Sequence, residues 1–209
     1  MQKLIFIFIF LVSINSHAQI NGITETGDEI ILFENGTWQY VNDSLNVKVE
    51  TLKNKTIYVK EKNATFLVKS NNTNIGIYIN PKDWNFKKGE AMDDADLVFE
   101  HKHKDLYGMI LTEKIELPLE SLANIAYDNA KSAATNVQIK KKDLRQVNDR
   151  EILMMQMTGN IQGIDFIYYG YYYSDENGAH QILTYTSQNL FDEYKNDMEK
   201  FLNGMVLTD

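Results

Sequence analysis

The sequence predicts an α+β fold in which an antiparallel sheet is covered by helices and preceded by a small β-hairpin. Three observations lead to this prediction. Short strand-like runs follow one another with turn residues between them, helical patterns with one apolar face occur in two places, and an Asn-Gly turn lies near the amino end. Successive hairpins combined with two helices are typical of a sheet covered by helices on one face.

The first 18 residues are expected to form a signal peptide. Lys3 supplies positive charge, and the apolar run Leu4–Val12 is shorter than the about twenty residues that a membrane-spanning helix needs. Ser16-His17-Ala18 places small residues at the −3 and −1 positions of a cleavage site. No cysteine follows for lipid attachment. The sequence thus predicts export, to the periplasm or out of the cell, with no membrane anchor after cleavage.

The predicted hairpin occupies residues 19–41. Its strands, Glu29–Phe33 and Thr37–Val41, flank Asn35-Gly36, a strong signal for a tight turn. A lone hairpin is barely stable in water, so this one is expected to dock on its own domain or on another chain. The polar residues 42–55 show no periodicity and are expected to be a linker, and residues 56–209 are expected to form the α+β domain.

The predicted domain alternates strands with two helices. A first-turn proline, Pro118, begins an amphipathic helix over 118–134 with a face of small residues, and a second helical stripe runs from Leu190 to Leu202 and closes at Gly204. Strand-like runs are expected at 65–70, 75–80, 96–103, 106–115, 137–145, 151–158, 164–174 and 181–186.

The composition excludes several classes of function. Among 209 residues, 29 are acidic and 21 basic, and the net charge of −8 disfavours nucleic acid and anionic membrane surfaces as partners. The absence of cysteine removes disulfides, thiolate metal sites and cysteine nucleophiles. The basic run Lys140–Lys142, with Arg145 nearby, is expected to be a solvated face in so acidic a chain.

The sequence carries no catalytic motif with a known mechanism. It lacks G-x-S-x-G, a phosphate-binding glycine loop, H-E-x-x-H and a dinucleotide fingerprint. We therefore expect a non-enzymatic protein without a cofactor.

A pair of histidines is the candidate metal site. His101 and His103 are two apart on an expected strand, so both rings should point to one face, and Asp93, Asp94 and Asp96 lie just upstream. Imidazole and carboxylate groups suit zinc and related ions. The alternative interpretation is an exposed strand end whose polar residues guard a sheet edge.

A tyrosine-rich strand is the candidate binding surface. Because strand side chains alternate, the tyrosines of the segment 166–173 must line both faces of the sheet. One face is expected to pack under helices, and the other to offer an aromatic platform to a sugar or to a partner's side chains. The alternative is cross-strand packing alone. The candidate binding residues are Tyr169, Tyr171 and Tyr173, together with Trp38 of the hairpin. Gly170 between them indicates a bulge or a close approach of the backbone.

Two stretches resemble a known family. Ile75–Trp84, which reads IGIYINPKDW, is similar to the glycine, hydrophobic strand and Pro-x-x-Trp opening of PsbP-like domains. Gln181–Thr186, followed by a helix ending in Phe201-Leu202, is similar to that family's last strand and last helix. The resemblance covers roughly residues 63–209 and implies an α-β-α sandwich.

The family includes an extrinsic subunit of the oxygen-evolving photosystem, a nuclear-transport factor that binds the GTPase Ran, and many secreted bacterial proteins. It implies no shared catalytic residues. Glu34–Trp38 lies outside that domain and resembles an "acidic residue, x, Gly-Thr-Trp" element of secreted bacterial proteins.

The expected function is that of an exported, non-enzymatic protein of a bacterial cell envelope that binds an envelope protein partner. The tyrosine strand and the Trp38 hairpin are the surfaces expected to make contact. The alternative is a small-ligand or glycan binder, or a hydrolase, with a metal site at His101 and His103.

Overall fold

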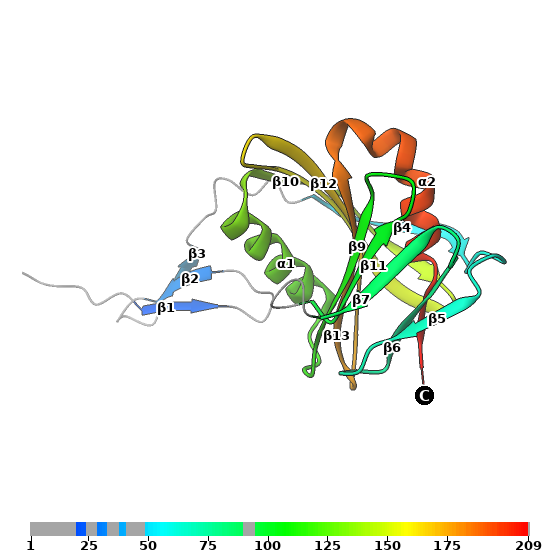
Figure 1. Cartoon of the computed structure of the whole chain (residues 1–209). Coiled ribbons are helices and arrows are strands. Elements are labelled where there is room, and N and C mark those ends of the chain that lie inside the picture. Colours follow the sequence, from blue (N-terminus) through cyan, green and yellow to red (C-terminus); the bar gives the residue numbers. More distant parts are fainter. Residues whose placement is uncertain (1–19, 24–28, 33–37, 41–48, 90–94, 209) are drawn as a thin grey trace, which may run out of the picture.

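The computed structural model describes residues 20–23, 29–32, 38–40, 49–89 and 95–208 (Figure 1). The predicted signal peptide and the Asn35-Gly36 turn lie outside these residues, and of Trp38 only the backbone is described. Within the described part of the chain, no helix is both long and apolar enough to cross a membrane.

The described strands form three sheets. A small sheet has the order β1-β2-β3, a large one the order β4-β10-β11-β12-β13-β9-β8-β7, and a third the order β14-β6-β5. The strands are β1 (Ile20–Ile23), β2 (Glu29–Leu32), β3 (Trp38–Tyr40), β4 (Thr51–Tyr58), β5 (Phe66–Lys69), β6 (Ile75–Ile79), β7 (Trp84–Lys88), β8 (Leu97–His101), β9 (Tyr107–Glu113), β10 (Thr135–Val147), β11 (Arg150–Ile161), β12 (Ile164–Asp175), β13 (Gly178–Ser187) and β14 (Met205–Leu207).

The two edge strands of the large sheet, β4 and β7, were not expected from the sequence. β4 pairs in parallel with β10, so the sheet is mixed and the prediction of a purely antiparallel sheet is wrong in this detail. Residues 51–55, predicted as part of a linker, belong to this edge strand. Most β4 side chains are exposed, so the strand is held by backbone pairing and shows no apolar alternation in the sequence.

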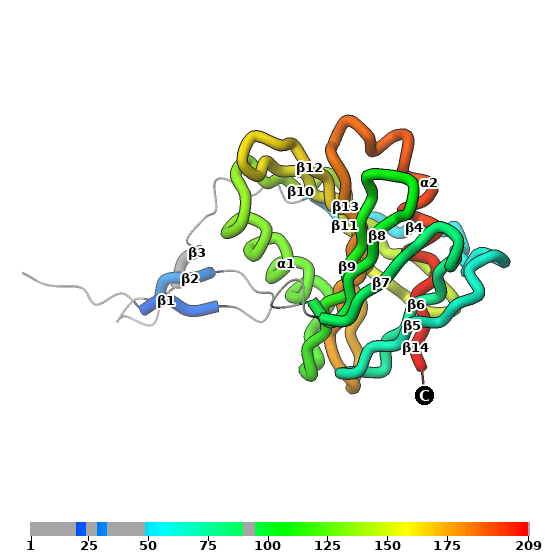
Figure 2. Tube along the Cα trace, viewed as in Figure 1, coloured from blue at the N-terminus to red at the C-terminus, as the bar shows by residue number. Residues whose placement is uncertain are grey.

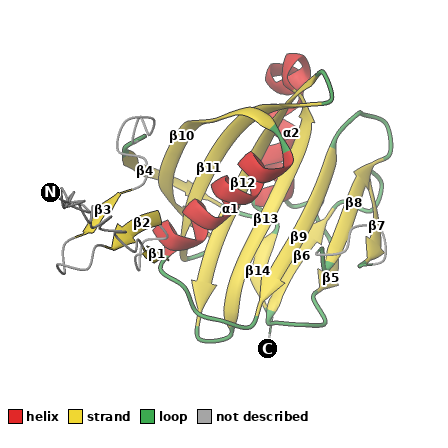
Figure 3. Ribbon diagram, turned by 90° about the vertical axis from the view of Figure 1, so that its left-hand side faces the viewer, coloured by secondary structure: helices red, strands yellow, loops and turns green. Residues whose placement is uncertain are grey.

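The large sheet has one helix on each face. α1 (Leu119–Ala133) contacts β10, β11 and β12, whereas α2 (Phe191–Leu202), which follows a short 3₁₀ turn, contacts β12, β13 and β6. Figure 3 shows α1 in front of the sheet and α2 behind it. The expectation that both helices cover one face is therefore wrong. The described chain is mostly β, with one large sheet and two short helices.

Two apolar clusters follow from this arrangement. Alternate residues of β11 point to opposite faces, so Ile152 and Met154 join the cluster on the α2 side while Leu153 and Met155 join the cluster under α1. The α2 side also receives the third sheet, in which the carboxyl-terminal β14 lies beside β6 from the start of the domain (Figure 2). Part of the α1 face lies beyond the reach of the helix, and the candidate site occupies that part.

Candidate functional site

Strand β12 directs Tyr169 and Tyr171, two of the predicted binding residues, to the face of the sheet that α2 covers. Tyr169 and Tyr171 are 1% and 0% exposed and lie in the cluster under α2. They offer no exposed ring face, so the expectation that these two tyrosines form an aromatic platform for a sugar or a partner is wrong. The register of β12 between β11 and β13 is unbroken through Gly170, where a Cβ atom would overlap Leu183. Gly170 therefore serves a close approach and not a bulge.

Their hydroxyl groups belong to a buried polar network centred on Arg145. Arg145 donates to Tyr169 Oη through Nη2 at 2.8 Å and to Asp143 through Nε at 2.7 Å. Tyr171 donates to Asn203 at 2.8 Å, and Tyr169 donates to Glu199 of α2 at 2.6 Å. The side chains of Arg145 and Asp143 are 2% and 3% exposed, so the prediction that this basic run is a solvated face is wrong at Arg145.

The pKa shifts within this network keep each of its groups in one protonation state, as expected of a network that stabilises the fold. Burial alone would lower the pKa of Arg145, but the hydrogen bond to Asp143 and the neighbouring tyrosines raise it. Burial raises the pKa of both Tyr169 and Tyr171, against the opposing effect of the guanidinium. The tyrosines therefore stay neutral and the arginine stays charged, and this network attaches α2 to the sheet.

Tyr173, the third tyrosine predicted to bind, lies at the end of β12 beside a buried histidine. Its ring is parallel to that of His180, with 6.1 Å between centroids and an interplanar angle of 11°. His180 is 0% exposed, its Nδ1 lies 3.4 Å from Thr73 Oγ1, and its Nε2 has no hydrogen-bond partner among the described residues. Burial lowers the pKa of His180, and nearby Asp175 opposes that shift.

The two histidines predicted to bind metal are close, with 6.2 Å between ring centroids, but they differ in environment. His101 ends β8, is buried against Trp84, and accepts a hydrogen bond at Nδ1 from the backbone N–H of His103, whereas His103 is exposed in the following turn. Asp96 lies before the other end of β8 and accepts a hydrogen bond from Ser70. Among the described residues no three potential ligands gather around a common point.

An aromatic ladder crosses the part of the α1 face that the helix leaves open. Tyr185 on β13 lies between Tyr168 on β12 and Tyr107 on β9. The Tyr107 and Tyr185 rings are stacked at 5.4 Å and 21°, and Tyr168 meets Tyr185 edge-on at 5.6 Å. All three tyrosines are half-buried. Met109 and Leu183, next on the same strands and face, are already buried with residues of α1.

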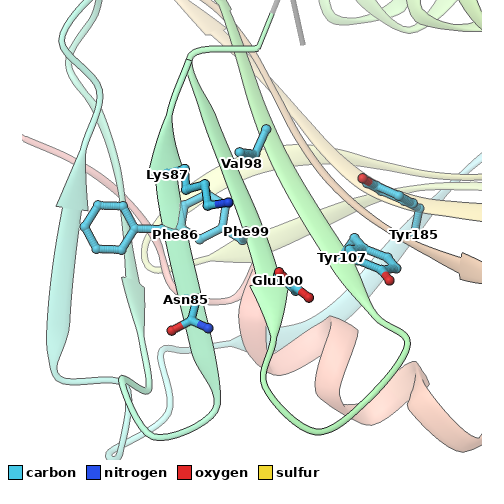
Figure 4. Close-up of a pocket in the computed structure, with 8 residues that line it drawn as sticks. All are labelled: Asn85, Phe86, Lys87, Val98, Phe99, Glu100, Tyr107 and Tyr185. Carbon is cyan, nitrogen blue, oxygen red and sulfur yellow. The ribbon is translucent and has the colours of Figure 1, made fainter. Parts of the chain in front are cut away.

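A hollow of about 180 Å³ continues this ladder toward the β7 edge of the sheet (Figure 4). This volume is far more than the about 15 Å³ that a single water needs. We call the hollow the tyrosine slot. It is lined by Asn85, Phe86, Lys87, Val98, Phe99, Glu100, Tyr107 and Tyr185.

The slot combines an apolar wall with two opposite charges. Glu100 lies directly across the strand pair from Tyr107, and Lys87 lies across from Val98 on the outer strand β7. Within the described residues neither Glu100 nor Lys87 takes part in an ion pair. A hydrogen bond to Asp105, with further contributions from burial and from the charges of Asp105 and Glu100, raises the pKa of Tyr107. Burial raises the pKa of Tyr185 to about 12.

Sequence reasoning found the tyrosine strand but missed the slot. The platform is built by Tyr107 and Tyr185, which stand on other strands, and Tyr168 is the member of the tyrosine run that joins them. Alternation did show that the two sets of tyrosines face opposite ways. Which set is covered depends on where α1 and α2 pack, and Tyr107 and Tyr185 meet only through the pairing of β9 with β13. Trp38 cannot be assigned to a site, since its side chain lies outside the described residues.

Comparisons with known proteins gave structural likenesses only. No protein-family model and no curated protein matches the chain. Among solved structures the chain is similar to cyanobacterial PsbP (CyanoP) from Synechocystis, with 11% identity, a TM-score of 0.49, and coverage of 68% of this chain and 91% of that one.

Two further structures are similar at the same level. A protein of unknown function from Pseudomonas aeruginosa has 10% identity and a TM-score of 0.45, covering 69% of this chain and 97% of that one. A Bacteroides thetaiotaomicron protein has 11% identity and a TM-score of 0.41, covering 65% of this chain and 46% of that one. A PsbP-fold protein is thus among the structures that this chain resembles.

Proposed function

We propose that this chain is a non-enzymatic binding protein of a bacterial cell envelope, and that the tyrosine slot is the surface that contacts its protein partner. The observation that carries the proposal is the half-buried Tyr107–Tyr185 stack beside an open hollow on the sheet face that α1 only partly covers. Tyrosines that stay half-exposed beside a hollow are typical anchors of protein interfaces, because a large rigid ring loses little entropy on binding.

The cellular setting is part of the same proposal. The signal-peptide pattern of residues 1–18 supports export, to the periplasm or beyond, and the absence of a following cysteine supports a mature protein without a lipid anchor. The Pro81-Lys82-Asp83-Trp84 opening and the close of the domain support a place among secreted bacterial PsbP-like proteins.

A site-specific cross-link tests the proposal. A photo-reactive amino acid at position 98, inside the slot, is expected to capture one envelope protein in living cells, whereas the same group at exposed Ile164 on β12 is not. The captured protein is then purified and its Kd for the whole chain measured. The Tyr107→Ala/Tyr185→Ala variant should lose about 2 kcal/mol or more of binding free energy, roughly thirtyfold in Kd.

The matched control is Tyr78→Ala. Tyr78 is also half-buried, but it lies on β6 of the third sheet, away from the slot. Unchanged binding in Tyr78→Ala together with weakened binding in the double variant supports the proposal. Equal binding by the double variant and the parent chain would contradict it.

The same slot also favours the alternative function, a small-ligand or glycan binder, because tyrosine rings stack on sugars as well as on side chains. A panel of cell-wall sugars tests this reading by thermal unfolding. A sugar at about a hundred times its Kd adds roughly 2.7 kcal/mol to the free energy of unfolding, a shift of several degrees. If a sugar gives such a shift and the shift is lost in Tyr107→Ala/Tyr185→Ala, the slot binds a glycan and not a protein partner.

A further inference from the structure

The two faces of the Tyr107 ring have different neighbours. Strand β9 lies between β13 and β8 in the large sheet, so one ring face is taken by Tyr185 and the other looks over β8 into the slot. The side chains of Val98 and Glu100 project from β8 on this same face of the sheet (Figure 4). The slot therefore has an aromatic wall with a carboxylate beside it.

The charge beside this wall is negative. Glu100 and Asp105 are both exposed, Glu100 forms no ion pair within the described chain, and the charges of both carboxylates act on the Tyr107 hydroxyl. Lys87 stands across the slot on β7 and repels a cation seated on that side. A cation is therefore favoured only next to Tyr107, where the ring quadrupole and two carboxylates attract it together.

We propose that the tyrosine slot takes an arginine side chain of the protein partner, stacked on Tyr107 and paired with Glu100. This inference rests on the proposed function and names the chemistry of the partner. The net charge of −8 supports it, because an acidic protein attracts a basic partner at long range. A planar guanidinium can lie flat on a tyrosine ring and donate two parallel hydrogen bonds to one carboxylate, which a lysine ammonium cannot do.

Small probes test the assignment on the full chain. N-acetyl-arginine amide is titrated while the NMR signals of the Tyr107 and Tyr185 rings are followed. N-acetyl-citrulline amide, neutral and of nearly the same shape, and N-acetyl-lysine amide, charged but not planar, are titrated in the same way. We expect saturable shifts of both rings with the arginine probe, no saturable shift with citrulline, and binding of lysine that is clearly weaker than that of arginine.

Two substitutions localise the binding. Glu100→Gln keeps the shape and removes the charge, so it should weaken arginine binding by about tenfold. Glu113→Gln is the matched control, since Glu113 is also exposed and lies at the far end of the neighbouring strand β9. It should bind the arginine probe as the parent chain does.

Three outcomes would overturn the arginine assignment: equal binding of citrulline and arginine, unchanged binding in Glu100→Gln, or no ring shift with any probe. Its failure is distinguishable from that of the proposed function. If the cross-linked partner still loses affinity for Tyr107→Ala/Tyr185→Ala, the slot binds a protein through another side chain and only the arginine assignment fails. If the partner binds that variant normally, both proposals fail.

Discussion

Arg145 and Asp143, two residues apart on β10, form an ion pair with 2.7 Å between Nε and Oδ1 in the apolar cluster between the sheet and α2. The guanidinium also lies 4.6 Å from the centre of the Tyr58 ring, on edge strand β4. One buried cation thus contacts three separate parts of the fold: strand β4, the tyrosines of β12, and α2 through Glu199. Because the pair is buried and hydrogen-bonded, losing one partner leaves the other charge buried with only a more exposed counter-charge.

Arg145→Ala is expected to destabilise the protein by about 3–5 kcal/mol, since the buried Asp143 then keeps only the half-exposed Lys141 as a counter-charge, and the hydrogen bonds of Arg145 to the tyrosines of β12 are lost. Urea unfolding monitored by circular dichroism measures the loss. Lys141→Ala is the control: Lys141 also contacts Asp143, at 3.1 Å, but its side chain is 47% exposed, and it should cost less than about 1 kcal/mol. Equal losses in the two variants would show that the burial of Arg145 does not decide its contribution.

The tyrosines should ionise in distinct groups during an alkaline titration. Burial raises the pKa of Tyr169, Tyr171 and Tyr172 far enough that these residues should ionise only when the protein unfolds, whereas Tyr185 should titrate near pH 12. Absorbance at the tyrosinate band, recorded beside circular dichroism, separates the groups. Full ionisation of every tyrosine before any loss of structure would contradict the assignment of these side chains to the core.

Stability should fall as the pH drops below about 6.5. Burial lowers the pKa of His180 and of His101 from 6.5, so the unfolded chain binds these protons more tightly than the folded one. Their stabilising effect is complete above pH 6.5 and is lost below it, at up to about 1.4 kcal/mol per pH unit for each histidine. Denaturant unfolding between pH 7.5 and pH 5 measures this slope.

His180→Gln removes one of the two titrating groups and should reduce that slope. Asp175 is the charged group that opposes the shift of His180, so Asp175→Asn should steepen the loss of stability on acidification. An unchanged slope in both variants would show that His180 is not the group that titrates.

Gly108→Ala should destabilise the protein by about 1–3 kcal/mol. A Cβ atom at Gly108 would lie 2.9 Å from Cζ of Phe201, which α2 holds 4.4 Å from the Trp84 ring. Adding Phe201→Leu should relieve the overlap, so the double variant should lose less than the sum of the two single losses. Strict additivity would mean that α2 simply shifts away.

Zinc is a direct test of the histidine pair. His101 Nδ1 already accepts a hydrogen bond from the His103 backbone, and the described residues bring no third ligand near. We therefore expect the same melting temperature in chelator and in zinc. A saturable rise with zinc that disappears in His101→Ala/His103→Ala would restore the predicted metal site and with it the alternative function.

Local patterns were enough to predict most of the domain's elements. Residues of β11 and β12 alternate between two faces, and the apolar stripes around Leu122 and Met198 repeat with the helical period. Both patterns depend only on the period of the backbone, so they can be predicted from the sequence. The Asp143–Arg145 pair was not predicted, because the spacing of two residues places both on one face but does not show that β4 and α2 bury that face. The edge strands β4 and β7 were missed because most of their side chains are exposed, and exposed strands lack the apolar alternation that marks a buried face.

What the sequence by itself determined is which tyrosines of β12 share a face. Only the tertiary structure decided that α2 buries Tyr169 and Tyr171, while Tyr168 joins Tyr185 and Tyr107 beside α1. The physical reason is that the alternation of side chains along a strand is set by the local backbone geometry, which does not depend on the rest of the fold. The choice of covered face and the meeting of β9 with β13 come instead from long-range packing, in which each helix settles on the face that buries its own apolar stripe.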